Sequence, residues 1–454
     1  MKQFLTTNTL SYLRFWARKA LLRHNPIIIG IAGSVGKSST RNAIEAILKD
    51  HFPIKAVGNS ETGIPLGILG MKPESYSKFE WLVMCAKAPA NLNFLKGTKY
   101  LIAEMGIDEP EPPKNMEYLL TILKPEIAVS LNVSATHSLQ FDKTVAKEGL
   151  SETERLTKVV QNIAKEDTKI INESGCKVGI YNADDEYVRN QIQDNKLTAK
   201  LLTFGTKNTY DISYGLYRVS LKGTSFDYFV KIDGKRHEFN LTFSKYVLPR
   251  EYREVFAAAI MVALQTGLTL EQIKESLEKN YELPKGRASI FKGINETTIF
   301  DSTYNASKAS TYAFLDLVDT LKKETNREIV FLMGDMRELG EESRIEHREV
   351  AEKLVGIVDY LYLVGPMTRE YVLPTIQAHE SKFKEMRWFD TAPRASEYLK
   401  DNLPKNAIIL AKGSQNTIFL EEAVKMILED KKDDKKLCRQ NEYWLEVKKT
   451  SFAR

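Results

Sequence analysis

The sequence predicts an α/β protein with two parallel-sheet regions, and three observations support this fold class. Short apolar runs that end in polar or glycine-containing loops alternate with helical segments, as in a mostly parallel sheet. This alternation occurs twice, before and after about residue 283 of the 454-residue chain. Between the two regions, residues 200–247 alternate apolar and polar residues around glycine-containing turns, which predicts a small antiparallel section.

Composition excludes several classes of protein. Hydrophobic residues make up 43% and charged residues 28%, so the chain is neither disordered, collagen-like nor a disulfide-rich miniprotein. A net charge of +5 on so long a chain does not indicate a nucleic-acid partner. The three cysteines form no CxxC pair, which favours a reducing cytoplasm. The opening residues do not have the pattern of a signal peptide, so we expect none, and no apolar run reaches the roughly 20 residues that cross a membrane.

Residues 3–24 predict a helix in which apolar and basic residues alternate. Leu10, Leu13, Ala17 and Ala20 recur at helical spacing, and several arginines and lysines lie around them. The simplest interpretation is a helix packed on the next domain. The alternative is a basic amphipathic helix that contacts a membrane surface or a partner.

The first α/β region begins with the buried strand PIIIGIAG, from Pro26, and a helix over residues 38–52. Further strands or apolar segments are expected at 81–88, 100–106, 126–134 and 177–185, and two helices at 254–267 and 269–280. The second region contains four apolar runs, at 297–305, 328–336, 360–367 and 406–414. Ligands of such sheets bind at the carboxyl ends of the strands. The charge run at 429–440 is interpreted as a solvated face.

The most specific motif is GIAGSVGKSST, from Gly30 to Thr40, between a strand and a helix. Backbone N–H groups of such a loop can surround a phosphate, and the helix N-terminus adds partial positive charge. Lys37 can reach the terminal phosphates of a nucleotide, and the Ser38 hydroxyl can bind Mg²⁺. The common pattern G-x-x-x-x-G-K-[ST] is not matched strictly, because Ile31 replaces its first glycine. The expected ATP-binding residues are Gly33, Ser34, Val35, Gly36, Lys37, Ser38 and Ser39.

More motifs follow in order: GNSETGIPLGIL, LIAEMGIDEP, IAVSLNVSATHSLQF, YNADDEYV, LTFG, KGRASI, DSTYNASKAS, FLMGDMRELGEES and LAKGSQN. This ordered set, from about residue 26 to residue 420, resembles the Mur ligase family of ATP-dependent amide ligases, in particular the branch that adds D-alanyl-D-alanine. The resemblance implies a central ATP-binding domain at 26–282 and a Rossmann-like C-terminal domain at 283–454, preceded by the helical segment 1–25. It also implies phosphoryl transfer from ATP to a carboxylate, followed by attack of an amine on the acyl phosphate.

The resemblance also implies roles for individual residues. Glu104 and His137, each after an apolar strand, would help to hold magnesium, together with Ser38. Many family members brace a second magnesium ion with a carbamylated lysine, and Lys165 is the best match here. Lys169 and Lys158 compete with it, because the distance from His137 is longer than expected.

In the last third of the chain, Arg287 resembles the family arginine that reaches the γ-phosphate. Asp301 resembles the acidic residue near the ATP ribose, and Tyr304 and Asn305 line the same loop. The loop that begins at Lys412 is expected to help close the site.

Two departures from the family pattern limit what the resemblance implies about ligands. Glu251 and Val255 stand where the related branch has a histidine and the asparagine that contacts adenine. Only 29 residues precede Gly30, so we expect the N-terminal UDP-binding domain to be lacking.

The sequence therefore predicts a cytoplasmic, monomeric ligase of peptidoglycan (cell wall) biosynthesis that uses ATP and Mg²⁺. Its substrates would be a small-molecule or nucleotide-linked peptide and an amino compound. Two alternatives stay open: a Mur-type ligase for a non-UDP acceptor such as a pseudomurein, poly-amino-acid or folate-like compound, and a non-catalytic ATP-binding scaffold.

Overall fold

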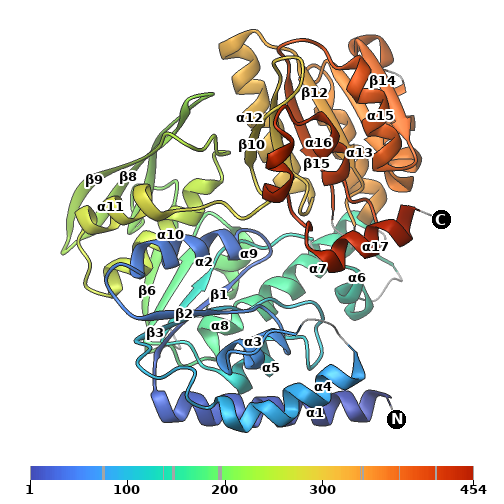
Figure 1. Cartoon of the computed structure of the whole chain (residues 1–454). Coiled ribbons are helices and arrows are strands. Elements are labelled where there is room, and N and C mark those ends of the chain that lie inside the picture. Colours follow the sequence, from blue (N-terminus) through green and yellow to red (C-terminus); the bar gives the residue numbers. More distant parts are fainter. Residues whose placement is uncertain are drawn as a thin grey trace. The chain divides into compact units, whose positions relative to one another are not determined.

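The computed structural model describes residues 2–73, 77–135, 138–145, 149–192, 197–337, 339, 342–377, 379–414 and 417–452. These residues form two compact units (Figure 1). The first unit comprises residues 1–216, 227–241 and 253–282, and the second comprises residues 217–226, 242–252 and 283–454.

A nine-stranded sheet, in the order β2-β3-β1-β4-β5-β6-β7-β8-β9, contains the strands of the first α/β region. Strands β2 to β7 pair in parallel. Its strands are β1 (Ile27–Ala32), β2 (Ile54–Val57), β3 (Tyr100–Glu104), β4 (Ile127–Ser130), β5 (Val178–Asn182), β6 (Lys200–Gly205), β7 (Ile212–Ser220), β8 (Gly223–Ile232) and β9 (Lys235–Phe243). The fold class predicted from the sequence is confirmed.

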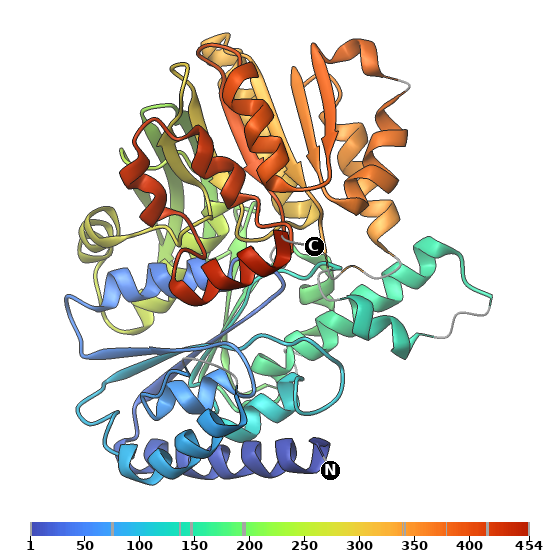
Figure 2. The ribbon, with the colours of Figure 1, turned by 45° about the vertical axis from the view of Figure 1, so that its right-hand side comes forward.

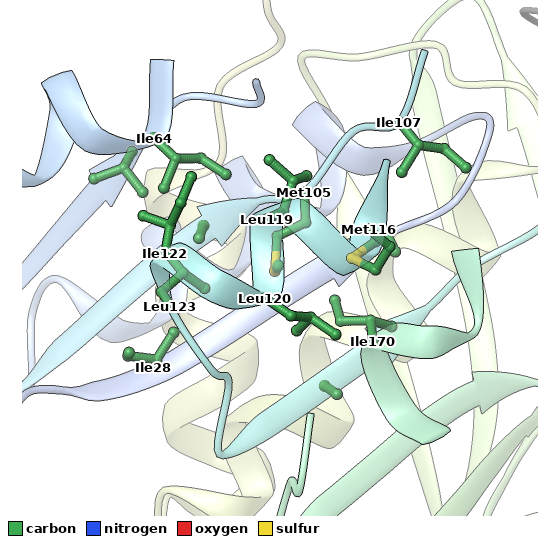
Figure 3. Packing of buried hydrophobic residues seen from close by; sticks show 14 of the residues in the cluster. Ile28, Ile64, Met105, Ile107, Met116, Leu119, Leu120, Ile122, Leu123 and Ile170 are labelled. Carbon is green, nitrogen blue, oxygen red and sulfur yellow. The ribbon is translucent and has the colours of Figure 1, made fainter. Parts of the chain in front are cut away.

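The helices of this half of the chain connect and cover the parallel strands. They are α1 (Lys2–His24), α2 (Lys37–Leu48), α3 (Gly63–Ile68), α4 (Lys78–Lys87), η1 (Ala88–Asn91), α5 (Met116–Ile122), α6 (Ser138–Phe141), η2 (Asp142–Thr144), α7 (Glu152–Asp167), α8 (Lys169–Asn172), α9 (Glu186–Gln191), α10 (Tyr252–Gln265) and α11 (Leu270–Asn280). Apolar side chains from α5, α8 and the strands make one core beneath the sheet (Figure 3). This packing fixes the carboxyl ends of β1, β3 and β4 relative to one another, because protein interiors are close-packed.

The predicted N-terminal helix is confirmed as α1, which packs on the first unit. Leu13, Ala17 and Ala20 are fully buried along one side of α1. The helix lies at the edge of the unit beside α3 and α4 in both views (Figures 1 and 2). The interpretation as a helix packed on the next domain is therefore correct for its inner face.

Two expectations for the first region need correction. Residues 81–88, expected as a strand or apolar segment, lie mainly in α4, which begins after Ser77, whose hydroxyl accepts a hydrogen bond from the Glu80 N–H. This N-cap and the following Leu, Met and Ala residues favour a helix over a strand. Residues 200–205, expected in the antiparallel section, form β6, which pairs in parallel with β5 and β7. The hairpin strands begin only with β7.

The second unit contains a six-stranded sheet in the order β10-β11-β15-β12-β13-β14. Its strands are β10 (Ser289–Lys292), β11 (Thr298–Ser302), β12 (Ile329–Gly334), β13 (Tyr360–Val364), β14 (Glu385–Phe389) and β15 (Ile408–Lys412). Strand β10 is antiparallel to β11, and the other neighbours are parallel. The four predicted apolar runs become β11, β12, β13 and β15, whereas β10 and β14 were not anticipated.

Helices cover both faces of this second sheet. They are α12 (Lys308–Thr325), α13 (Ser343–Leu354), η5 (Thr368–Val372), α14 (Leu373–Gln377), η6 (Glu380–Lys382), α15 (Ala392–Asn402), α16 (Glu421–Ile427), η7 (Lys431–Lys436) and α17 (Glu442–Phe452). Helices α15 and α16 share a core with Val330 and Ile409. Phe331 and Leu410, next to these residues in β12 and β15, point to the opposite face and are also buried.

In the part of the chain that the structure describes, no helix is both long enough and apolar enough to span a membrane.

Candidate functional site

The phosphate loop lies between β1 and α2 in the first unit, as the sequence predicts. Gly33 and Gly36 have φ values of +134° and +93°, in the region that favours glycine. A Cβ atom on Gly33 would lie 3.0 Å from the Cβ of Leu131. Both glycines are therefore required by the turn itself, and helix α2 begins directly after it at Lys37.

The segment after β4 braces this loop. The Ser34 N–H donates to the Asn132 carbonyl at 2.7 Å, and the Val35 N–H donates to the Asn132 side chain at 3.1 Å. Asn132 in turn donates to Glu254 of α10 at 3.3 Å. Asn132 was not singled out from the sequence, although its position directly after a predicted strand was the available signal. The bracing fixes the loop in one conformation before any phosphate binds.

Lys37 and Ser38 make contacts within the loop region that a nucleotide would replace. The Lys37 ammonium donates to the Gly33 carbonyl and, at 3.4 Å, to the Ser34 carbonyl. The Ser38 hydroxyl donates to Glu104 Oε2 at 3.0 Å. Glu104 ends β3 and is almost completely buried. The structure thus brings together three residues predicted to act on the phosphates and their metal ion.

Arg41 is a further member of this group that sequence reasoning missed. One turn beyond Lys37 in α2, its Nη1 atom lies 2.7 Å from Glu104 Oε1. Glu104 therefore has a partner on each oxygen, which explains how a buried carboxylate stays in place. The signal in the sequence was weak, because a basic residue four positions after the loop lysine also fits an ordinary helix surface.

The hydroxyl of Ser38 and the carboxylate of Glu104 are oxygen ligands of the type that Mg²⁺ prefers. Over the described residues, no group of three or more His, Cys, Asp or Glu side chains lies close enough to hold a metal ion alone. Magnesium in nucleotide sites is commonly held by one or two protein oxygens plus phosphates and water. The residues present therefore fit a nucleotide-bound magnesium ion. His137, the other predicted metal ligand, lies outside the described residues.

Asp167, at the end of α7, is the third residue of the site that sequence reasoning missed. Its side chain is buried, and its carboxylate faces the Gly33 N–H and the Lys37 ammonium of the phosphate loop. Burial raises the pKa of Asp167 to about 7, against the opposing effects of the Lys37 charge and of the Gly33 N–H. The available signal was its position two residues after Lys165.

The three candidate lysines do not share this environment. Lys165 is exposed on α7, and the expectation that it braces a metal ion has no support from that position. Lys169 lies 2.8 Å from Glu166 and is engaged in that ion pair, and Lys158 is exposed on α7. Val255, at the position of the expected adenine asparagine, packs beside Gly36.

The second unit places its predicted residues at the carboxyl ends of β11 and β15. Asp301 is buried and accepts hydrogen bonds from the Thr303 N–H at 3.1 Å and the Thr303 hydroxyl at 2.6 Å. Burial raises the pKa of Asp301 to about 6. The Lys412 ammonium, from the adjacent strand, donates to the Ser302 hydroxyl at 3.2 Å and the Asn305 carbonyl at 3.1 Å. Burial lowers the pKa of Lys412 to about 7, and the Arg287 charge lowers it further, while Asp301 opposes this shift.

Tyr304 links the remaining predicted residues of this unit. The Arg287 guanidinium lies 4.7 Å from the centre of the Tyr304 ring, and Tyr304 itself is exposed. Arg439 donates to the carbonyls of Thr303 and Tyr304 at 2.7 and 3.2 Å. The interpretation of 429–440 as a solvated face is wrong for Arg439, because it is buried in an ion pair with Glu421.

Two family descriptions match the chain. "Mur ligase middle domain" matches residues 31–147, and "Mur ligase, glutamate ligase domain" matches residues 286–415. The first match contains the phosphate loop and Glu104, and the second contains Arg287, Asp301 and Lys412.

Relatives similar over most of the chain are also found. The UDP-N-acetylmuramoyl-tripeptide–D-alanyl-D-alanine ligase of Buchnera aphidicola is 25% identical, over 92% of this chain and 79% of that protein. The enzyme of the same name from Bacillus subtilis is 24% identical, over 94% and 81%.

Solved structures show the same fold. MurF from Acinetobacter baumannii has a TM-score of 0.69 at 19% identity, over 93% of this chain and 81% of that one. MurF from Thermotoga maritima in complex with ADP has a TM-score of 0.68 at 20% identity, over 92% and 83%.

Proposed function

We propose that this chain, which belongs to the Mur ligase family and is an ATP-dependent, ADP-forming ligase, adds D-alanyl-D-alanine or a similar amine to a cell-wall peptide precursor. The amine acceptor would be a carboxylate on a nucleotide-linked peptide. The names of the relatives in several organisms support this substrate pair. The three free cysteines support a cytoplasmic location.

The first step transfers the γ-phosphoryl group of ATP to the substrate carboxylate. One carboxylate oxygen forms a bond to the γ-phosphorus, and the bond from that phosphorus to ADP breaks. Such a step depends on positioning and charge neutralisation. Lys37, released from the carbonyls of Gly33 and Ser34, would neutralise the terminal phosphates, while the braced loop holds them through its N–H groups.

Magnesium would bind at Ser38 and Glu104 and supply charge neutralisation for the phosphates. For Glu104 to bind magnesium, its oxygens have to release their present partners, Ser38 and Arg41. Ser39, in the first turn of α2, is buried, and His137 stays a predicted ligand.

The second step is attack of the amine nitrogen on the acyl carbon. The tetrahedral intermediate then expels phosphate, and the nitrogen loses a proton. We propose that residues 26–282 bind ATP and that the Rossmann-like residues 283–454 contribute Arg287, Asp301, Tyr304 and Asn305 toward the nucleotide. The clustering of these four residues around β11 supports a common role.

The observation that carries this proposal is the phosphate loop, in which Lys37 binds the loop carbonyls and the Ser38 hydroxyl donates to Glu104. Purified chain should release phosphate from ATP only when a carboxylate peptide and D-alanyl-D-alanine are both present, and mass spectrometry should detect the amide product. Binding of ATP without product from any pair of substrates would instead indicate the non-catalytic scaffold.

A second proposal keeps the chemistry and changes the acceptor to a non-UDP carboxylate, such as a pseudomurein, poly-amino-acid or folate-like compound. It is one of the alternatives that the sequence leaves open. A panel of carboxylate acceptors separates the two, because turnover restricted to the UDP-linked peptide would reject this version.

We also propose that the outer face of α1 contacts an anionic membrane surface. Opposite the buried face, α1 exposes Phe15 and Leu22, the latter with 81% of its surface accessible, and α4 beside it exposes Phe79. Exposed cations lie among them: Arg18, Lys19 and Arg23. Aromatic and aliphatic side chains between cations favour the boundary of an anionic bilayer.

Co-sedimentation with vesicles tests this face. Binding should be stronger to phosphatidylglycerol than to phosphatidylcholine vesicles and should weaken with salt. The double variant Phe15→Ser/Leu22→Ser should lose it, whereas Leu216→Ser, at an exposed leucine elsewhere, should not. Unchanged sedimentation of the double variant would reject the proposal, and a concentration-dependent dimer broken by the same variant would assign the face to a second copy.

A further inference from the structure

Asp167 is an unusual carboxylate for a helix end. Only 1% of its surface is exposed, yet its Oδ1 atom has no hydrogen-bond partner among the described residues. The groups of the phosphate loop that act on this carboxylate are the Lys37 ammonium and the Gly33 N–H, and both favour its ionised form. Buried carboxylates are normally paired, because an unpaired one costs free energy. An exception beside a nucleotide loop indicates an oxygen kept available for a ligand.

The neighbouring residues of α7 cannot supply this oxygen. Glu166 points elsewhere, accepting the Met116 N–H at 2.8 Å and pairing with Lys169. Lys165 is two residues before Asp167, and residues so spaced lie about 200° apart around a helix. Asp167 is turned inward to the loop, and Lys165 is exposed on the other side. A carbamate on Lys165 would therefore face solvent.

The charges around the loop also favour a cation near Asp167. Lys37 is the nearby positive group, and its ammonium contacts loop carbonyls that bound phosphates would displace. With Lys37 drawn to the phosphates, the Asp167 carboxylate and the phosphates are like charges close together. A divalent cation between them removes this repulsion, and carboxylate plus phosphate oxygens is the usual donor set for magnesium.

We propose that Asp167 provides the anionic oxygen for a divalent cation bound with the nucleotide, in place of a carbamylated lysine. This inference rests on the proposed ligase function for the nucleotide that accompanies the cation. It makes the chain independent of carbon dioxide, since a carboxylate needs no covalent modification to serve as an oxygen ligand for the cation.

Manganese binding to the full chain in the presence of ADP, followed by electron paramagnetic resonance, tests the proposal without turnover. Asp167→Asn should weaken manganese affinity at least tenfold. The same variant should unfold at an equal or higher temperature without ligand, because it removes a buried charge. Glu166→Gln is the matched control: it should lower the unfolding temperature and leave manganese affinity unchanged.

Bicarbonate provides the second measurement. Turnover of the wild type should be the same in carbon-dioxide-free buffer and after addition of bicarbonate, and Lys165→Ala should retain it. Unchanged manganese affinity in Asp167→Asn would overturn the proposal, as would bicarbonate-dependent turnover that Lys165→Ala abolishes. Ligase activity that survives either result leaves the proposed function intact, whereas absence of product from wild type would reject that function and not the cation site.

Discussion

The phosphate loop of the first unit and the carboxyl ends of β11 and β15 in the second differ in how their buried charged groups are paired. In the first, Glu104 has both Ser38 and Arg41 as partners, and Lys37 is bound by loop carbonyls. In the second, Asp301 keeps one oxygen, Oδ2, without a hydrogen-bond partner among the described residues, and the buried Lys412 has neutral partners for its ammonium.

This difference indicates that the two regions would bind a charged ligand from different starting states. The loop residues are paired in the free protein and have to exchange partners on binding. The residues around β11 and β15 are held by the sheet in an unpaired state, at a cost in stability that a ligand would recover. Asp167 is the exception in the first unit, because it resembles Asp301 more than Glu104.

The largest effect should come from Lys37→Ala. Loss of the loop ammonium leaves the terminal phosphate charge without its main neutralising group, so turnover should fall by a factor of about 10³ or more. Phosphate release in the presence of both substrates measures it. Lys49→Ala, at the exposed end of the same helix, is the control and should remain near wild type. Turnover of Lys37→Ala within tenfold of the wild type would contradict the role of the loop.

The conformation of the chain could be predicted from the sequence where it depends on neighbouring residues. The loop needs glycine at two positive-φ positions, then lysine and serine at a helix start, and all of this is contiguous. The parallel strands were visible as apolar runs, because both faces of these sheets are covered. Glu104 was singled out through the family resemblance, and its position at the end of one such run agrees with that choice.

The missed residues depend on contacts between distant segments. Arg41 and Glu104 are 63 positions apart, and Asp167 reaches Gly33 from a helix more than 130 residues later. No spacing rule relates such pairs. The prediction for the charge run at 429–440 was wrong at Arg439 for a related reason. The composition of the run predicts solvent exposure, but Arg439 is buried because it pairs with Glu421, which is distant in the sequence.

The ion pair of Arg439 tests whether the second region depends on buried charge. Arg439 binds both oxygens of Glu421, at 2.8 and 2.6 Å, and supports the carbonyl of Thr303. Arg439→Met should lower the free energy of unfolding by about 3 kcal/mol, because Glu421 keeps only Lys448 as a buried cationic partner among the described residues. Urea denaturation measures this loss.

The exposed pair of Arg394 with Asp390 gives the matched control for Arg439→Met. Arg394→Met should change the free energy of unfolding by less than about 1 kcal/mol. Equal effects of the two variants would show that the second region does not depend on the buried pair.

Lys412 should give the second region a pH dependence that Lys412→Met removes. The folded pKa is about 7, whereas an unfolded lysine titrates near 10.4, so the unfolded state binds more protons between these values. The free energy of unfolding should therefore rise with pH in this window, by at most about 1.4 kcal/mol per pH unit. Asp301 titrates below it, with a pKa of about 6. Urea midpoints at pH 7, 8 and 9 measure the slope, and parallel curves for wild type and variant would contradict the unpaired state of Lys412.

The smallest effect compares one hydroxyl donor in each region. Ser38→Ala removes the donor to Glu104 Oε2, while Arg41 stays on Oε1 at 2.7 Å, so the free energy of unfolding should fall by only about 0.5–1 kcal/mol. Thr303→Val removes the 2.6 Å donor to Asp301, which keeps only the Thr303 N–H among its described partners. Its loss should cost about 1–2 kcal/mol, because the buried carboxylate is left less satisfied. Thermal unfolding at pH 8 compares the two variants. Equal decreases in unfolding temperature would mean that Glu104 and Asp301 depend equally on these hydroxyl donors.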